Sequence, residues 1–178
     1  MLEEAAGELF LERGYATTSV ADITQRAGVS RSTFFNYFTA KSDLLWAAFD
    51  ERVEALGAAL AAGPTDATPG AVVEAALRDL AARLPADHVA LAFTQADTMG
   101  LGDDLRLATA RRTADLGSTI AGYATGRGVD PLHARVAGTA WAGALVAAVE
   151  AWALAGAERT RLPDLLDRAL APVRSALA

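Results

Sequence analysis

Two glycines divide the first 38 residues of the chain into three short segments, each with apolar side chains at helical spacing. The first segment, residues 2–13, stops at Gly14, because glycine readily ends a helix. The second begins after a run of Thr and Ser residues that can cap a helix, and it stops at Gly28. The third begins after Ser30 and runs to about Phe38. Three short helices with a glycine in the second turn predict a helix-turn-helix.

The remainder of the chain also follows a helical pattern, and the fold class that the sequence predicts is all-α. Alanine is abundant, Pro residues lie far apart, and runs of β-branched residues are few. The stretch GPTDATPG, residues 63–70, has the composition of a loop, and Asp130 followed by Pro131 is typical of a helix start. The helices expected after the first three cover residues 40–62, 70–84, 87–99, 103–126, 131–156 and 163–177.

These patterns divide the 178 residues into two expected domains. Residues 1–46 form the helix-turn-helix domain, and residues 47–178 form a larger helical domain without a motif of comparable clarity. The segment 139–156 approaches the length of a membrane span, but its apolar residues are mostly Ala and Gly, and Glu150 lies inside it. Burial of this segment against other helices is therefore expected rather than contact with lipid.

Charge and residue content exclude several classes of function. The chain has no cysteine, so a disulfide framework, a thiolate metal site and a cysteine nucleophile are all excluded. It carries none of the common catalytic or phosphate-loop motifs, and neither an enzymatic activity nor a cofactor or metal is expected. The formal net charge of −6 argues against nonspecific binding of nucleic acid over the whole surface. The bases Arg26, Arg31 and Lys41 nevertheless gather around the third segment, which allows a local positive face.

The third segment separates apolar from hydrogen-bonding side chains. In a helix over this segment, Phe34 and Phe38 share a face that can pack on the second helix. The other surface keeps the side-chain types that read base edges in a major groove or hold phosphates. These DNA-binding candidates are Ser30, Arg31, Ser32, Thr33, Asn36 and Tyr37.

Positions on either side of this segment predict phosphate contacts. Lys41 lies in the first turn of the next helix, where the helix dipole disfavours a cation unless an anion binds there. Thr17 and Thr18, at the start of the second helix, form a matching clamp on the other side. Double-stranded DNA is accordingly the expected partner. Such helix triples also occur in proteins that bind no DNA, and Lys41 can equally be a solvated lysine, so this alternative stays open.

The stretch ELFLERGYATTSVADITQRAGVSRSTFFNYFTAKSDLL, within residues 2–46, resembles the N-terminal domain of the tetracycline-repressor (TetR) family of transcriptional regulators. Its RGY, TT…AGVS and TFFNYFTAK parts follow the family's order and spacing. The resemblance implies a sequence-specific DNA-binding regulator. Phe35 stands where the family usually has Tyr, so Tyr37 is expected to carry more of the phosphate contact. The basic arm that many relatives carry before the first helix is missing, which is expected to weaken binding unless the true start lies upstream.

For residues 47–178, the same resemblance implies an effector-binding and dimerisation domain. Proteins of this kind act in the cytoplasm as homodimers, bind a small molecule between the middle helices, and commonly repress until that ligand releases them from a palindromic operator. The ligand-binding candidates are Phe93, Thr94, Gln95, Met99, Tyr123 and Trp141. The expected dimer interface, on the last two helices, consists of Leu145, Ala148, Trp152, Leu166 and Leu170. For both sets, ordinary packing within one subunit is the alternative.

A second class of function remains open, namely an adaptor or oligomerisation module that has lost DNA binding. The presence of Thr33, Tyr37 and Lys41 argues against it, whereas Phe35 and the missing arm argue for it. No pattern in the sequence indicates the effector or the regulated genes.

Overall fold

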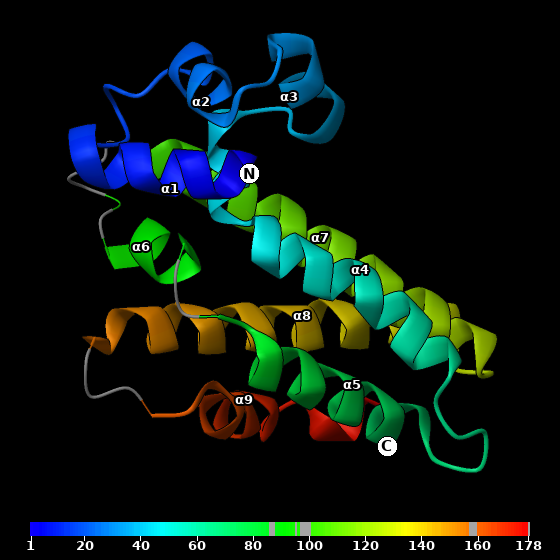
Figure 1. Cartoon of the computed structure of the whole chain (residues 1–178). Helices are drawn as coiled ribbons and strands as arrows, with labels where there is room; N and C mark the ends of the chain where they lie inside the picture. The colour runs from blue at the N-terminus through cyan, green and yellow to red at the C-terminus, as the bar shows by residue number, and fades with distance from the viewer. Residues whose placement is uncertain (86–87, 95, 97–100, 157–159, 178) are drawn as a thin grey trace. The chain divides into compact units, whose positions relative to one another are not determined.

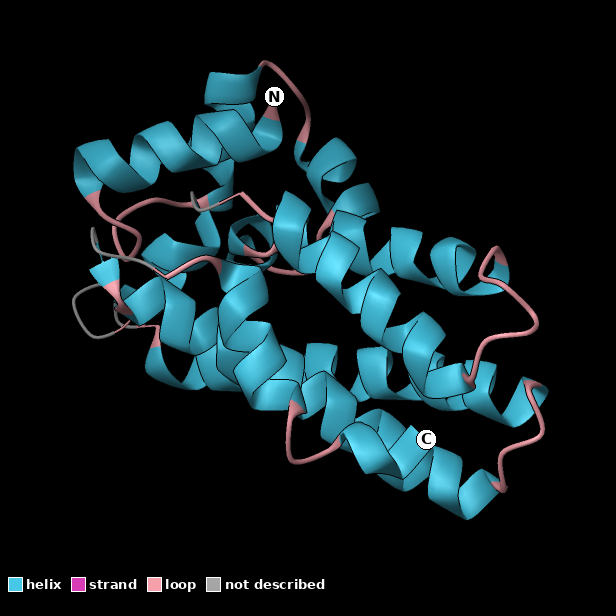
Figure 2. Cartoon of the chain, turned by 90° about the horizontal axis from the view of Figure 1, so that it is seen from below, coloured by secondary structure: helices cyan, strands magenta, loops and turns pink. Residues whose placement is uncertain are grey.

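The computed structural model describes residues 1–85, 88–94, 96, 101–156 and 160–177. Over these residues the chain forms helices and no strand, so the all-α fold class is confirmed (Figures 1 and 2). The α-helices are α1 Leu2–Arg13, α2 Val20–Ala27, α3 Arg31–Tyr37, α4 Ala47–Ala61, α5 Pro69–Arg83, α6 His88–Thr94, α7 Gly102–Gly126, α8 Pro131–Leu154 and α9 Leu162–Leu170. Two 3₁₀ helices are η1 Lys41–Leu45 and η3 Arg174–Leu177.

The chain forms two compact units, and each is described by itself. The first contains Met1–Ala48 and Pro85–Ala108, and the second contains Phe49–Leu84 and Thr109–Ala178. The helices α4 and α7 each begin in the first unit and continue into the second. The first unit therefore combines the helix-turn-helix with residues that the functional division at residue 46 assigns to the C-terminal domain. That functional division remains a proposal.

The helix expected over 40–62 is interrupted near its start. The carboxylate of Asp43 accepts hydrogen bonds from the backbone N–H groups of Thr39 and Ala40, both at 3.0 Å, and so caps η1. The consecutive side chains 44–46 are all buried. Three consecutive positions of an α-helix point in widely different directions, so burying all three in one core favours the tighter 3₁₀ turn before α4 begins.

The last helix is shorter than its expected span of 163–177. Proline has no backbone N–H to donate and disfavours a helical residue before it, so Pro172 ends α9 soon after Leu170. The chain turns there, and the carbonyl of Val173 accepts a hydrogen bond of 3.1 Å from the indole N–H of Trp141. The end of the chain is thereby attached to α8.

Aromatic pairs hold the first unit together. Within it α1 contacts α2 and η1, α2 contacts α3, and α6 contacts η1. The rings of Phe10 and Tyr15 lie 5.0 Å apart at the end of α1. The rings of Trp46 and Phe93 lie 5.6 Å apart, edge to face, and attach α6 to the segment after η1. These contacts form a core directly beneath α2 and α3.

The second unit is centred on α8, which packs against α9 and η3. Where α7 and α8 cross, Gly117 faces Gly138, and a side chain at Gly138 would overlap the carbonyl oxygen of Gly117. A buried ion pair joins α7 to α4, because Arg112 donates through Nε and Nη2 to the two carboxylate oxygens of Asp50 at 2.7 and 2.5 Å. Arg112 is only 6% exposed, so this bidentate geometry is needed to satisfy its charge.

The glycine crossing generates a stability prediction. Gly138→Ala adds a methyl group against backbone atoms of α7, which cannot move aside as a flexible side chain can. We expect the free energy of unfolding to fall by about 1–3 kcal/mol, the usual cost of overpacking. Urea titration followed by helical circular dichroism measures it.

The matched control is Gly57→Ala in α4, where an added methyl group meets nothing within 4 Å. Alanine favours a helix interior over glycine, so this variant should be more stable by about 0.5–1 kcal/mol. Equal stability changes in the two variants would show that the crossing tolerates a side chain.

Candidate DNA-binding surface

Side-chain caps define the ends of α2 and α3. The hydroxyl of Ser19 accepts from the N–H of Asp22 at 3.2 Å, and the Asp22 carboxylate accepts from the N–H of Ser19 at 2.8 Å. Hydrogen bonds from Ser19 hold the pKa of Asp22 below its ordinary value. Gly28 ends α2 in the left-handed conformation, with φ 68°, and Ser30 caps α3 by accepting from the N–H of Thr33 at 3.0 Å. The turn between α2 and α3 is therefore fixed at both ends.

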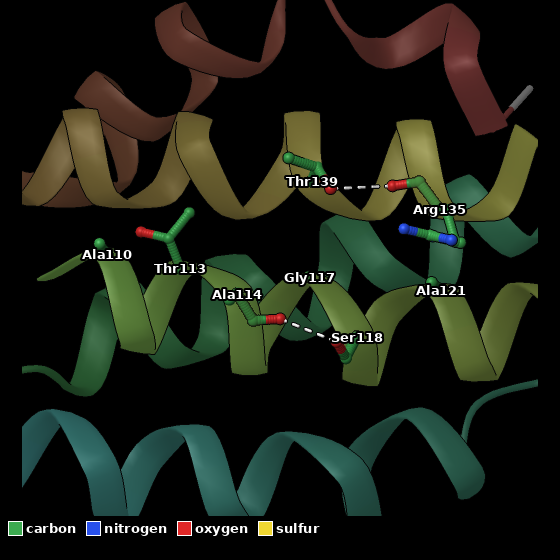
Figure 3. Close-up of a pocket in the computed structure, with 8 residues that line it drawn as sticks. All are labelled: Ala110, Thr113, Ala114, Gly117, Ser118, Ala121, Arg135 and Thr139. Carbon is green, nitrogen blue, oxygen red and sulfur yellow. Dashed lines mark hydrogen bonds between the residues drawn. The ribbon is translucent and has the colours of Figure 1, made fainter. Parts of the chain in front are cut away.

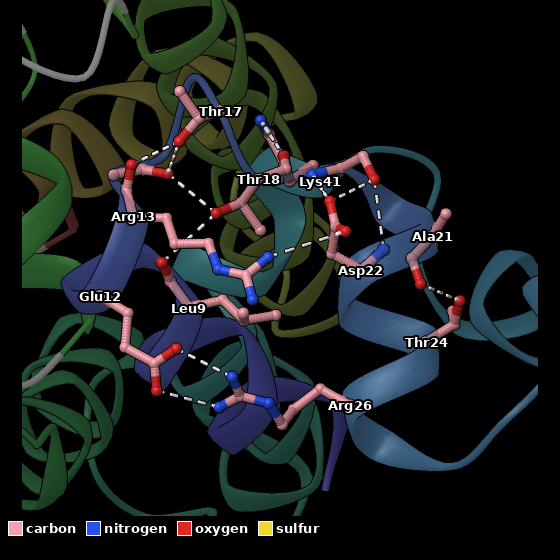
Figure 4. A network of polar contacts seen from close by, with 12 residues as sticks. Leu9, Glu12, Arg13, Thr17, Thr18, Ala21, Asp22, Thr24, Arg26 and Lys41 are labelled. Atoms are coloured by element: carbon pink, nitrogen blue, oxygen red, sulfur yellow. Dashed lines mark hydrogen bonds and ion pairs between the residues drawn. The ribbon is translucent and has the colours of Figure 1, made fainter.

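An ion-pair cluster joins α1 to α2 (Figure 4). The guanidinium of Arg26 donates to Glu8 at 2.9 Å and to Glu12 at 2.8 Å. Its hydrogen bond lowers the pKa of Glu12, and the hydrogen bonds to Glu12 and Glu8 raise the pKa of Arg26. The positive charge expected from Arg26 near α3 is thus neutralised by its neighbours on α1.

One face of α3 is buried and the other is open. Phe34 is fully buried, and its ring lies 5.5 Å from that of Phe38, as the shared face requires. Tyr37 is 76% exposed and Phe35 is 51% exposed. Among the described residues, four exposed polar side chains of α3 make no hydrogen bond or ion pair, and these are Arg31, Ser32, Asn36 and Tyr37. This face is available to an outside partner.

The two hydroxyls at the start of α3 form a pair. The oxygens of Ser30 and Thr33 lie 2.9 Å apart, and either group can donate to the other. Only one hydroxyl proton is used in this contact, so one of the two remains for an outside acceptor such as a phosphate oxygen. Ser30 and Thr33 can therefore provide one donor together rather than two.

The expected phosphate clamp at the start of α2 is occupied by other contacts. The hydroxyl of Thr17 donates to the carbonyl of Arg13, and that of the buried Thr18 donates to the carbonyl of Gly14 at 2.8 Å. A hydroxyl has a single proton, and a phosphate oxygen only accepts. In this arrangement both threonines cap the end of α1 and have no proton left for a phosphate (Figure 4).

Lys41 also points into the protein. Its Nζ donates to the carbonyl of Tyr15 at 2.5 Å and to that of Thr18 at 2.7 Å, and it lies 3.9 Å from the centre of the Tyr15 ring. Desolvation lowers the pKa of Lys41, and burial raises the pKa of Tyr15 to about 12. Two of the three ammonium protons hold the α1–α2 turn, so at most one remains for DNA.

Comparisons with known proteins agree with this arrangement. Residues 2–48 match the family described as bacterial regulatory proteins, tetR family. FadR of Thermus thermophilus, a TetR-family transcriptional repressor solved in complex with lauroyl-CoA, is similar at 26% identity and a TM-score of 0.63; the match covers 99% of this chain and 93% of that protein. The chain belongs to the TetR family.

Two further solved structures share the fold of this TetR-family chain. FadR of Bacillus subtilis in complex with stearoyl-CoA is 21% identical, with a TM-score of 0.57 and coverage of 99% and 98% of the two chains. A putative TetR-family regulator from Mesorhizobium loti is 24% identical, with a TM-score of 0.52 and coverage of 99% and 93%. Among curated proteins no match is found.

The ligand-binding candidates in the first unit have packing partners. Phe93 lies edge-on to the ring of Trp46, and the hydroxyl of Thr94 donates to the carbonyl of Ala90 in its own helix at 2.8 Å. Gln95 and Met99 lie outside the described residues. Phe93 is half-buried and Thr94 is exposed.

The two candidates in the second unit also have structural contacts. The hydroxyl of Tyr123 accepts from Arg127 at 2.6 Å, and Arg127 in turn donates to carbonyls of the loop before α5. Trp141 is 1% exposed and donates to the end of the chain. Contact of any of these residues with a ligand therefore remains a prediction.

The expected dimer residues of this TetR-family chain lie inside one subunit. Each is at most 7% exposed in the single chain, because α8 packs on α9 there. The alternative of ordinary packing within a subunit accounts for all five, which are Leu145, Ala148, Trp152, Leu166 and Leu170. A partner subunit can reach only other side chains unless α8 and α9 separate.

The structure of Lys41 generates a prediction that separates folding from DNA contact. Lys41→Met removes two hydrogen bonds and leaves two carbonyls without their donor, so the free energy of unfolding should fall by about 1–3 kcal/mol even without DNA. Arg31→Met, on the open face of α3, should leave stability unchanged and reduce the salt dependence of DNA binding by about one unit of slope.

Urea titration and binding at several salt concentrations measure both quantities. A Lys41→Met protein as stable as wild type, with a reduced salt slope, would show that Lys41 contacts phosphate instead.

Proposed function

We propose that this TetR-family chain is a homodimeric transcriptional repressor that binds a palindromic operator and is released from it by a small molecule in the cytoplasm. The observation that carries the proposal is the open face of α3. Its polar side chains have no partners among the described residues, while the caps and ion pairs around it fix its backbone. We propose no catalytic role for the chain.

The chemistry of each side chain suggests its part in binding. Arg31 and Asn36 can make paired hydrogen bonds to base edges, Arg to guanine and Asn to adenine. Ser32 can reach either a base or a phosphate, and Tyr37 has an exposed hydroxyl suited to a phosphate. The hydroxyl pair of Ser30 and Thr33 supplies one further donor. Thr17, Thr18 and Lys41 support this surface from beneath.

The adaptor alternative differs in what this face would do. With a net charge of −6, the chain gains little from general attraction to DNA. Its affinity must therefore come from specific contacts, and a chain that has lost DNA binding would show none. A gel shift with the DNA that flanks its own gene separates the two functions.

Substitutions on α3 should distinguish base reading from phosphate contact. Asn36→Ala should change the preference among operator variants by about 1–3 kcal/mol at one base pair, because it removes a base-edge contact. Tyr37→Phe, one residue further along the same face, should weaken binding about equally for all variants. Competition binding against a set of single-base operator variants measures both. An Asn36→Ala protein with the wild-type order of preference would exclude Asn36 from base reading.

We infer that the effector has an acyl-CoA character. The support is the similarity to the Thermus thermophilus FadR that was solved with lauroyl-CoA. An effector can release the operator only if it binds one arrangement of the protein better than the other. The candidates Phe93, Thr94, Gln95, Met99, Tyr123 and Trp141 are kept as proposed contacts.

Lauroyl-CoA should therefore weaken operator binding, and operator DNA should weaken lauroyl-CoA binding by the same factor, since coupling between two sites is reciprocal. A factor of about 5–150 is usual for such coupling. Dissociation constants for each partner, with and without the other, measure it by fluorescence anisotropy and calorimetry. Free lauric acid and CoA serve as controls. Tight binding of lauroyl-CoA with unchanged operator affinity would exclude it as the releasing ligand.

A further inference from the structure

The outer face of α8 carries a stripe of residues that is symmetric about Gly143. On one side are Leu132, Val136 and Thr139, and on the other are Ala147, Glu150 and Leu154. Each set lies 4, 7 and 11 residues from Gly143, a spacing that places all seven residues on one side of a helix. We call these seven residues the α8 stripe.

The α8 stripe is exposed although it contains large apolar side chains. Leu132 is 68% exposed, Val136 is 60% exposed and Leu154 is 57% exposed. The opposite side of α8 is buried within the second unit, where Trp141 and Leu145 lie. By length and hydropathy α8 could cross a membrane, but 61% of its apolar window is buried inside the chain. Exposed apolar residues aligned along one helix indicate a surface that a partner covers.

The small residues in the middle of the α8 stripe permit a close approach. A side chain added at Gly143 would meet nothing within 4 Å, so the space outside it is open. Beside the stripe, a groove of about 480 Å³ lies between α7 and α8 (Figure 3). Gly117, Arg135 and Thr139 are among its lining residues. Two helices with small residues at their crossing can approach to about 8 Å.

We propose that a second copy of the chain covers the α8 stripe, with the two α8 helices antiparallel and the two-fold axis at Gly143. The inference rests on the proposed function only in requiring a homodimer. In such a pair, each residue faces the residue at the same distance on the other side of Gly143. Leu132 then meets Leu154 of the partner subunit, and Thr139 meets Ala147 of the partner subunit.

The charges on α8 determine the antiparallel direction. Arg135 and Glu150 are its two charged residues at neutral pH, and they lie 8 and 7 residues from Gly143 on opposite sides. Antiparallel pairing places Arg135 within one residue, or about 1.5 Å along the axis, of Glu150 of the partner subunit. Parallel pairing would instead place like charges opposite each other. Among the described residues, the guanidinium of Arg135 has no hydrogen bond or ion pair, so it is available for this contact.

The same geometry accounts for the position of Glu150. Its carboxylate would otherwise interrupt an apolar stripe, at the place that corresponds to Val136 on the other side of Gly143. In the antiparallel pair its methylene groups cover Val136 of the partner subunit while its carboxylate reaches Arg135 of that subunit. Two such ion pairs form, one on each side of the axis.

Disulfide trapping tests the register, because the chain has no cysteine of its own. Leu132→Cys and Leu154→Cys proteins are prepared separately, then mixed, exchanged and oxidised. The mixture should form a covalent dimer, and each variant alone should not. In the antiparallel pair, two copies of the same introduced thiol lie about 33 Å apart, far beyond disulfide reach. Gly143→Cys alone should form the dimer, since its two copies meet at the axis.

A charge exchange provides a second measurement that needs no cross-link. Arg135→Glu and Glu150→Arg should each raise the dimer dissociation constant about tenfold, as expected for the loss of two exposed ion pairs. The double variant should restore it. Sedimentation equilibrium measures the constants, and circular dichroism confirms that each variant is folded. Arg168→Glu, on the exposed side of α9, is the control and should leave the dimer unchanged.

Three outcomes would overturn the proposed interface. They are a covalent dimer of Leu132→Cys alone, no covalent dimer from the mixture or from Gly143→Cys although the proteins remain dimeric, and a double charge variant no better than the single ones. A wild-type chain that is monomeric at all concentrations would also overturn it. Operator binding by wild type is measured in parallel, so failure of this interface with intact operator binding is distinguished from failure of the proposed function.

Discussion

A single ammonium group positions the candidate DNA-binding surface in the first unit. Lys41 follows α3 in the chain, and its Nζ holds the carbonyls of Tyr15 and Thr18 in the turn before α2. The hydroxyls of Thr17 and Thr18 in that turn bond to the end of α1, and Ser19 begins α2. The segments before α2 and after α3 are therefore fixed to each other. Because buried carbonyls need a donor, loss of this lysine would loosen both ends of the helix-turn-helix at once.

The open face of α3 could be predicted from the sequence, whereas the partners of the flanking polar residues could not. Phe34 and Phe38 identify the inner face by their spacing, and the remaining side chains must then face outward. For Lys41 and Thr17 the partners are backbone carbonyls, which every residue carries and which leave no pattern in the sequence. Each of these side chains is also chemically suited to a phosphate, so residue type alone favoured the wrong side of the domain as their place of contact.

Helix boundaries were predictable where glycine or proline imposes them and uncertain where burial decides. Gly14 and Gly28 end α1 and α2 as their conformational freedom suggests, both with positive φ. The interruption before α4 depends on the burial of Trp46 and its two preceding neighbours, which is a property of the packed core. In α8 the apolar residues surround the helix, so the sequence could not indicate which face is inside. Its largest side chains face α9, and the symmetric stripe remains outside.

The acidic character of the chain makes dimerisation and operator binding depend on each other. A single α3 offers few contacts, and the overall charge adds no general attraction to DNA. Joining two copies turns the second half-site contact into an intramolecular event and raises affinity without any new contact. The helix α7 continues from the unit that contains α3 into the unit that contains α8, where Gly117 touches Gly138. A ligand that shifts α7 along α8 is therefore linked through one continuous helix to the DNA-reading unit. It must favour the shifted arrangement by more than the operator favours the original one.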